Sequence, residues 1–270
     1  MRVDLYTRCW NDAHMLGFFF RHYDDIVNRY IVFDDGSTDG SLEILKSKAN
    51  VEIRPAPRLI DPTSRMLSNL PFHESCWKES RGRADWVIQT DIDEHLHHRD
   101  LRTYLERCKR SGITIIPALG YQMISDEVPP EGARLSRDLV IGAPWLEMNK
   151  LSIFSPDDVS ATHFRLGRHS AAPAGNIVAP AREEVLLLHY KYLGFERTYQ
   201  RHLKFSTRLG ERDRANGWGH KYLWSKEELR ADWENVKALA VDVSSDDLRP
   251  WETHAAPRWW MAIPRAAVSI

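Results

Sequence analysis

The segment ADWVIQTDIDEH, residues 84–95, places a short apolar run directly before a dense acidic cluster. The run at 86–88 predicts a buried strand, and Asp91 and Asp93 follow it at positions i and i+2. On an extended chain, side chains with this spacing point to the same side. Carboxylates packed so closely repel one another unless a cation is present, so the pair predicts a site for Mg²⁺ or Mn²⁺. Taken alone, such a tripeptide is more often a solvent-exposed loop at the end of a strand.

The same order, an apolar strand followed by polar residues, recurs along the first half of the chain. Residues 3–7 alternate apolar and polar before Asn11 and Asp12, and residues 30–33 lead into Asp34 and Asp35. Further strands are expected at 51–53 and 113–118, with helices over 12–27, after Asp39, over 73–81 and over 101–108. This alternation predicts an α/β fold with a mostly parallel central sheet flanked by helices. Ligands of such sheets bind beyond the carboxyl ends of the strands, where the acidic clusters fall.

The second half of the chain is less regular. Four prolines in residues 55–72 predict a loop, and residues 120–184 predict loops and short strands over the edge of the sheet. Residues 185–188 predict one more strand, which ends at His189 and precedes a basic helix over 195–208. The pattern weakens beyond residue 236. We therefore expect one domain over 1–235, with halves at 1–118 and 119–235, and a docked helical extension over 236–270.

Composition excludes several classes of protein. The chain has 270 residues, a hydrophobic share of 43% and a formal net charge of -1, which argues against global disorder and against a nucleic-acid binder. Three widely spaced cysteines without a CxxC pair argue against a thiolate zinc site and favour a reducing cytosol. The sequence shows no signal peptide and no apolar run near the ~20 residues of a spanning helix. We expect a cytoplasmic protein, either soluble or attached peripherally to the inner face of the membrane.

Three motifs together carry a resemblance to a known family. Asn11-Asp12, the run Asp34 to Asp39, and DWVIQTDIDE at 85–94 resemble the family 2 glycosyltransferases with the Rossmann-like GT-A fold. The segment 85–94 is most similar to the subgroup whose motif reads DWVxxxDxDE, and His189-Tyr190 resembles the His-Tyr pair of that subgroup. The resemblance covers residues 1–235.

The resemblance implies a donor site for a nucleotide sugar, with UDP and GDP sugars as the first candidates. The nucleoside would be held by residues of the first two strand ends, namely Thr7, Arg8, Asn11 and Asp35. Asp91 would contact the ribose or the metal, and Asp93 would bind Mn²⁺ or Mg²⁺ between diphosphate oxygens. His189 would be a further metal ligand or face the diphosphate; a lone histidine after an apolar strand is otherwise structural.

The acceptor side is less sharply marked. Asp126, with Glu127 in reserve, is the predicted general base, although an exposed acidic loop is the plainer interpretation. Residues 217–222 (GWGHKY) predict a mobile loop that orders over the donor. The predicted substrate-binding residues are Trp218, His220, Lys221, Glu94 and His169, and His95, His97 and His98 predict the start of a helix.

The sequence as a whole predicts a metal-dependent, inverting and non-processive glycosyltransferase whose acceptor is a glycan, a lipid-linked glycan or another glycoconjugate. One alternative is a sugar-phosphate nucleotidyltransferase, which would require a glycine-rich phosphate loop near the amino terminus that residues 2–8 lack. The other is a non-catalytic carbohydrate-binding module, which the ten tryptophans would suit and the paired aspartates argue against.

Overall fold

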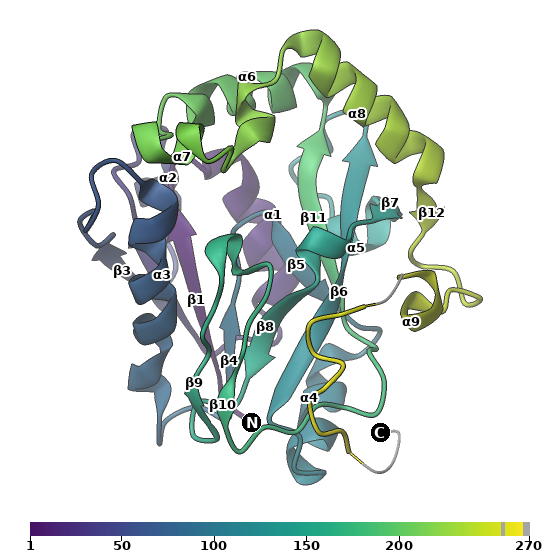
Figure 1. Cartoon of the computed structure of the whole chain (residues 1–270). Helices are drawn as coiled ribbons and strands as arrows, with labels where there is room; N and C mark the ends of the chain where they lie inside the picture. The colour runs from purple at the N-terminus through teal and green to yellow at the C-terminus, as the bar shows by residue number, and fades with distance from the viewer. Residues whose placement is uncertain (255–256, 267–270) are drawn as a thin grey trace.

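One large sheet runs through the molecule, and helices cover both of its faces (Figure 1). The computed structural model describes residues 1–254 and 257–266. Within these residues ten strands form the large sheet and two form a small one. The predicted α/β class is confirmed. The large sheet contains β1 Val3–Cys9, β2 Arg29–Asp34, β3 Val51–Pro55, β4 Trp86–Gln89, β5 Glu94–His97, β6 Ile115–Ser125, β7 Ile141–Pro144, β8 Lys150–Phe154, β11 Leu186–Leu193 and β12 Val241–Asp242; β9 Val159–Ala161 and β10 Ala174–Gly175 form the small one.

The parallel part of the sheet follows the sequence pattern. β3, β2, β1 and β4 lie side by side in parallel, with Leu5 paired to Tyr30 on one side and to Ile88 on the other. Side chains alternate between two cores, so that Leu5 and Tyr6 belong to different clusters. β11 is parallel to β6, and β8 is antiparallel to both β6 and β4. The carboxyl ends of β1, β2, β4, β6 and β11 therefore point the same way.

The stretch 120–184 contains the predicted loops and short strands, but the prediction that they all lie at the sheet edge is wrong, because one of them is central. β8 lies between β4 and β6, and all five of its residues are buried. β6 continues to Ser125, through the residues from Gly120 onward that were expected to be a loop. A Cβ on Gly120 would lie 2.3 Å from the Cβ of Met148. The glycine therefore permits close packing against the next segment and does not end the strand.

The helices agree with the sequence pattern except at the third. α3 begins at Arg65, within the segment predicted as a loop, where the Ser64 side chain accepts a hydrogen bond from the Leu67 N–H. The helix passes through Pro71 and ends at Ser75, so the predicted helix at 73–81 is its end plus a 3₁₀ turn. The helices are α1 Ala13–Tyr23, α2 Ser41–Lys46, α3 Arg65–Ser75, α4 Leu101–Arg110, α5 Leu135–Asp138, α6 Phe195–Ser206, α7 Glu211–Ala215, α8 Lys226–Leu239 and α9 Pro250–Thr253, with 3₁₀ turns η1 Cys76–Ser80, η2 Leu146–Met148, η3 Leu166–Arg168 and η4 His220–Leu223.

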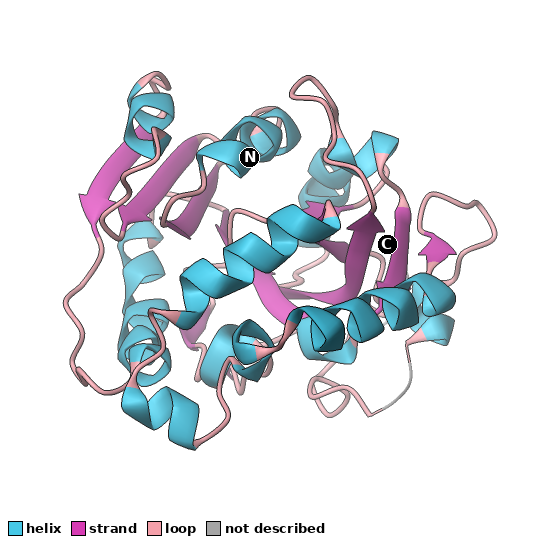
Figure 2. Ribbon diagram, turned by 90° about the horizontal axis from the view of Figure 1, so that it is seen from above, coloured by secondary structure: helices cyan, strands magenta, loops and turns pink. Residues whose placement is uncertain are grey.

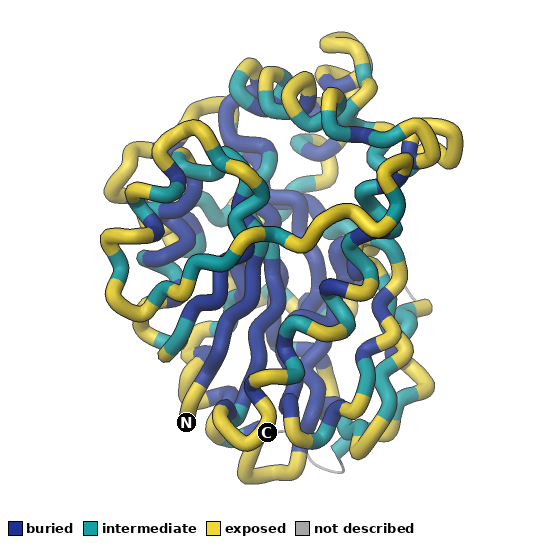
Figure 3. The backbone as a smooth tube through the Cα atoms, turned by 90° about the vertical axis from the view of Figure 1, so that its left-hand side faces the viewer, coloured by how far each residue is buried: buried dark blue, intermediate teal, exposed yellow. Residues whose placement is uncertain are grey.

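Three apolar clusters hold these layers together. α1 and α4 pack on one face of the sheet, and α3 and η1 pack on the other. A third cluster joins α6 and α8 to the ends of β6 and β11. These helices lie across the carboxyl ends of the strands (Figures 1 and 2), and the strands beneath are buried along their length (Figure 3). No helix among the described residues has the length and apolar character needed to cross a membrane.

The described part of the predicted extension packs onto this sheet. β12 pairs with β7 at the sheet edge. Trp260 is fully buried, and its indole N–H donates to Glu183 Oε1 at 2.7 Å. Residues 255–256 and 267–270 of the predicted extension lie outside the described residues. The predicted boundary at residue 235 falls inside α8, so the division of the chain stays a prediction.

Candidate functional site

Two acidic residues and a histidine meet where the carboxyl end of β4 lies beside the middle of β11. The predicted end of the strand at His189 is wrong, because β11 continues to Leu193. Asp91 and Asp93 lie on a tight turn between β4 and β5, closed by a 3.1 Å hydrogen bond from the Glu94 N–H to the Asp91 carbonyl. The prediction of an extended strand here is wrong, because Ile92 and Asp93 form this turn; Ile92 itself is only 3% exposed. His189 Nε2 lies 3.5 Å from Asp93 Oδ2. We call Asp91, Asp93 and His189 the Asp91–His189 group.

The neighbours of His189 fix its orientation. Gln122 donates its side-chain N–H₂ to the carbonyls of Met123 and His189, which turns its Oε1 toward the ring. His189 Nδ1 lies 2.8 Å from that oxygen and therefore donates to it. Nε2 is then turned toward Asp93. A histidine oriented in this way presents Nε2 to a metal ion held by the neighbouring carboxylate.

The two aspartates face different neighbours. Partial desolvation raises the pKa of Asp91, and the nearby Glu94 carboxylate raises it further. Desolvation also acts on Asp93, but His189 and Lys191 outweigh it and bring the pKa down to about 2. Asp93 is therefore ionised at neutral pH. The Asp91 side chain is half exposed, and that of Asp93 is 31% exposed.

A divalent metal fits this donor set in combination with a phosphorylated ligand. Within residues 1–254 and 257–266, no three His, Cys, Asp or Glu side chains gather closely enough to hold a metal ion by themselves. Mg²⁺ is usually held by one or two carboxylates and completes its shell with phosphate oxygens and water. Asp93 and Asp91 are oxygen donors of this kind, and His189 Nε2 adds a nitrogen donor.

A buried charge network supports the turn from below. Glu94 is 1% exposed, and its two oxygens lie 2.5 Å from Lys150 Nζ and 3.1 Å from Arg168 Nη2. Glu94 Oε2 also accepts hydrogen bonds from the Asp91 N–H and the Thr90 hydroxyl. Arg168 reaches on to Asp91 at 3.5 Å. Glu94, predicted to bind substrate, is thus enclosed by protein and positions Asp91; its contact with substrate stays a prediction.

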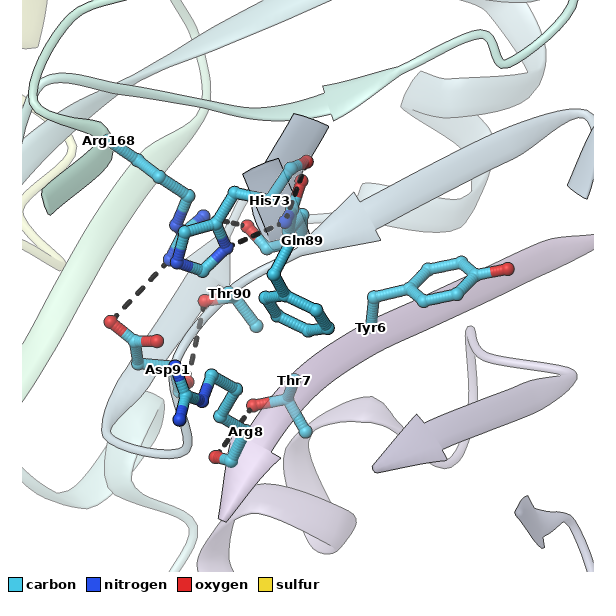
Figure 4. A pocket seen from close by; sticks show the side chains of 9 residues that line it. Tyr6, Thr7, Arg8, His73, Gln89, Thr90, Asp91 and Arg168 are labelled. Carbon is cyan, nitrogen blue, oxygen red and sulfur yellow. Dashed lines mark hydrogen bonds and ion pairs between the residues drawn. The ribbon is translucent and has the colours of Figure 1, made fainter. Parts of the chain in front are cut away.

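A narrow polar pocket opens beside Asp91 between the ends of β1 and β4 (Figure 4). Figure 4 shows Arg168 and Asp91 facing each other on one wall, with Thr7 and Arg8 on the β1 side. Gln89 is 2% exposed, and its Oε1 has no hydrogen-bond partner among the residues described. The pocket has no space for a water molecule beside this oxygen. The other lining residues are Tyr6, Phe72, His73 and Thr90.

Asp35 sits at the centre of an arginine cluster that the sequence did not reveal. Its Oδ2 lies 2.8 Å from Arg8, 2.6 Å from Arg65 and 2.7 Å from Arg208. Burial lowers the pKa of Arg8 and of Arg208, and the neighbouring Arg65 lowers both further. Three guanidinium groups on one carboxylate leave two positive charges in excess. Because Arg65 and Arg208 come from α3 and the end of α6, no local sequence signal links them to Asp35.

Asn11 joins the loops that follow β1 and β2. It has a positive φ of 53°, and its Oδ1 accepts a hydrogen bond from the Thr38 N–H at 2.6 Å. Its carbonyl accepts from Arg201 of α6. Arg201 also pairs with Asp12. Asn11 therefore holds the rim of the site together, and direct binding of a nucleoside by its side chain stays a prediction.

Asp126, the predicted general base, makes its contacts with α8. Asp126 follows β6, where Oδ1 accepts from the Trp233 indole at 3.0 Å and Oδ2 lies 2.5 Å from Lys237 Nζ. Those two hydrogen bonds lower the pKa of Asp126. Both partners belong to α8, and Glu127 beside it is exposed. These contacts favour an anchoring role for Asp126, and the base assignment of both residues stays a prediction.

The predicted substrate loop approaches His189 through aromatic rings. Lys221 Nζ lies 4.9 Å from the ring centroids of both Trp145 and Trp224, and the Trp145 ring lies 5.6 Å from that of His189. His220 is exposed at the loop surface. The Trp218 N–H donates to the Asp213 carbonyl, and His169 Nδ1 lies against the Glu147 carbonyl. Their roles toward substrate stay predictions. The predicted helix start at 95–98 is wrong, because His95 and His97 belong to β5.

No protein-family model matches the chain, and no curated protein matches its sequence. Among solved structures, S. aureus TarS residues 1–349 in complex with UDP is 11% identical, with a TM-score of 0.34 over 58% of this chain and 47% of that one. Another structure of S. aureus TarS is 10% identical, with a TM-score of 0.36 over 87% and 43%.

The glucosyl-3-phosphoglycerate synthase from Mycobacterium tuberculosis, in complex with Mn²⁺, UDP and glucosyl-3-phosphoglycerate, is 15% identical, with a TM-score of 0.30 over 44% of each chain. The chain thus spans less than half the length of these three structures. Similarities this low assign no activity, which must be argued from the site itself.

Proposed function

We propose that the protein is a metal-dependent glycosyltransferase that uses a nucleotide-sugar donor. The observation that carries this proposal is the Asp91–His189 group, whose two aspartates lie beyond the carboxyl end of the parallel strand β4, where α/β sheets bind their ligands. Asp93 and His189 would hold Mn²⁺ or Mg²⁺ together with the donor diphosphate, and Asp91 would face the metal or the ribose. A metal bound there would neutralise charge that develops on the departing diphosphate.

The residues around the group suit that chemistry. Arg8 stands on the Asp91 side, so a cationic group flanks the position proposed for the diphosphate. Fixed charges of this kind stabilise a leaving group without reorganisation. Glu127 remains the proposed base, since its neighbour Asp126 is bound to α8.

The arginine cluster favours a uracil base. All three arginines contact Oδ2 of Asp35, which leaves Oδ1 able to accept another hydrogen bond. The site therefore presents one acceptor flanked by N–H donors. The imide edge of uracil is its complement, with one N–H between two carbonyls, whereas guanine presents two adjacent donors and cytosine no ring N–H. We propose a UDP-sugar as donor and a glycan or lipid-linked glycan as acceptor.

Thermal unfolding with nucleotides tests the proposal. UDP should raise the Tm more than GDP or CDP, and only in the presence of Mn²⁺, since a ligand at 100 times its Kd adds about 2.7 kcal/mol. The base of dTDP has the same imide edge as uracil, so dTDP should stabilise the protein through its base as UDP does. Asp93→Asn should remove the Mn²⁺ dependence, and the exposed Asp25→Asn should keep it. No shift with any nucleotide would refute the proposal. Stabilisation by sugars alone would support the carbohydrate-binding alternative, and stabilisation by nucleoside triphosphates alone the nucleotidyltransferase.

A further inference from the structure

Two half-buried cations, one acting on Asp93 and one over α1, have no carboxylate partner among the described residues. Lys191 lies on β11 and Arg197 on α6, and among the described residues neither has an acidic group within 4.0 Å. Other cations around the site are paired, as Arg201 is with Asp12 and Lys221 is with Asp232. Removing a cation from water is unfavourable unless an opposite charge compensates for it. Lys191 and Arg197 therefore mark a place where a negatively charged ligand would be stabilised.

The fold directs Lys191 toward Asp93 by an irregularity in β11. The register against β6 shifts between His189 and Tyr192, so the strand bulges there. At the bulge the Tyr190 N–H donates to the Asp93 carbonyl at 2.7 Å, which brings the strand against the metal-binding turn. The Thr198 hydroxyl donates to the Lys191 carbonyl at 3.1 Å. The ammonium group lies 4.1 Å from the centroid of the Tyr222 ring, so its direction is defined.

Arg197 approaches from α6. Its guanidinium lies over the first turn of α1, where Nη2 is 3.5 Å from Met15 Sδ. The neighbouring exposed side chain is His14, and the charges of both Asp93 and Arg197 act on it. The nearest loop carboxylate, Asp39, already accepts from the Ala13 N–H and from Ser41. The positive charge of Arg197 is therefore left for a ligand.

The donor does not account for these two cations. Its diphosphate would lie against the metal at Asp93, while the arginine cluster at Asp35 faces the uracil base. The two positive charges of a divalent metal match the two negative charges of a nucleotide-sugar diphosphate. Lys191 lies on the Asp93 side and Arg197 lies over α1, and neither pairs with Asp35.

We propose that Lys191 and Arg197 form a subsite for an anionic acceptor, a sugar that carries a phosphate or a carboxylate group. This inference rests on the proposed function, since it assigns the second substrate of the same site. Arg197 offers a planar fork for two oxygens, and Lys191 offers a point charge. The acceptor hydroxyl would then be presented to the donor beside Asp93, with its anionic group held between β11 and α6.

Sugar binding in the presence and absence of UDP and Mn²⁺ tests the subsite. Saturation-transfer NMR titrations would compare glucuronate and glucose 6-phosphate with glucose. We expect both anionic sugars, or one of them, to bind at least tenfold more tightly than glucose. The preferred anion distinguishes a carboxylate acceptor from a phosphate acceptor. Lys191→Gln combined with Arg197→Gln should abolish the preference, while the affinity for UDP with Mn²⁺ changes less than twofold.

The control is Lys204→Gln, which removes an exposed cation from the same helix and should leave all affinities unchanged. Equal binding of glucose and the anionic sugars would overturn the subsite. So would a tenfold loss of UDP affinity in the double variant, because the cations would then serve the diphosphate. Failure of UDP to bind the unaltered protein would instead refute the proposed function, and the sugar preference measured without nucleotide would still decide the subsite.

Discussion

Glu94→Gln best tests whether Glu94 holds the site in place or contacts the substrate. Burial alone would raise the pKa of Glu94, but Lys150 and Arg168 hold it well below its ordinary value, so the side chain is charged. The variant keeps the shape of the side chain and removes its charge. Lys150 and Arg168 are 4% and 2% exposed and would then share only Asp91 as an opposite charge.

The expected loss of stability is large. Removing one partner of a buried ion pair costs about 3–5 kcal/mol, and in a protein of this size 1 kcal/mol corresponds to roughly 2–4 °C in Tm. We expect the Tm of Glu94→Gln to fall by about 10 °C. Because Glu94 also binds the Asp91 N–H, the affinity for UDP in Mn²⁺ should fall by about tenfold as well, as for other groups that orient metal ligands.

Denaturation by urea and a double-mutant cycle measure these effects. Adding Lys150→Met to Glu94→Gln should restore part of the lost stability, since the unpaired ammonium group is removed together with its partner. Asp25→Asn is the matched control, because its side chain is 79% exposed and its loss should leave the Tm within about 2 °C. A Tm change below 2 °C in Glu94→Gln, or strictly additive effects in the cycle, would refute the reasoning.

Three further predictions concern the elements around the site. Asp213→Ala should lower the free energy of unfolding by about 2 kcal/mol in urea denaturation, because the fully buried carboxylate accepts from the Ser64 hydroxyl at the start of α3; an unchanged midpoint would contradict this. Burial lowers the pKa of His22 to about 4, and its ring bonds the Leu96 carbonyl. The unfolded chain then binds the extra proton between pH 6.5 and 4, so stability should fall as pH falls through that window, by up to about 3 kcal/mol from this residue. His22→Gln should show a shallower fall in urea midpoints, and an identical pH profile would exclude the effect. Asp126→Asn should lower the Tm while kcat stays within about threefold, and a loss of kcat of a hundredfold or more would make Asp126 the base after all.

The sequence predicted those parts of the fold that depend on local order. The strands before Asn11, Asp34 and Asp91 are short, apolar and followed by polar turns, and their parallel pairing places all three clusters at one edge. β8 could not be predicted in this way, because its central position depends on pairing with strands before it in the chain. Gly120 suggested a turn, whereas its function is to allow Met148 to approach the backbone.

The site residues also divide into those that the local sequence predicts and those that depend on contacts between distant segments. Asp91, Asp93 and His189 were predicted together from their positions at strand ends, and His189 does lie beside Asp93. Arg65 and Arg208 were missed, since they approach Asp35 from helices far away in the chain. The supporting role of Glu94 was also hidden, because it depends on Lys150 of β8. Contacts between distant segments, unlike strand ends, leave no local pattern in a single sequence.

A crystal of the protein soaked with UDP and MnCl₂ tests the central claim most directly. Anomalous scattering at the manganese edge would locate the metal independently of the ligand. We predict one strong peak bound by Asp93 and by diphosphate oxygens, with the uracil N–H directed at Asp35 Oδ1. A peak away from the Asp91–His189 group, or a nucleotide bound elsewhere, would contradict the account.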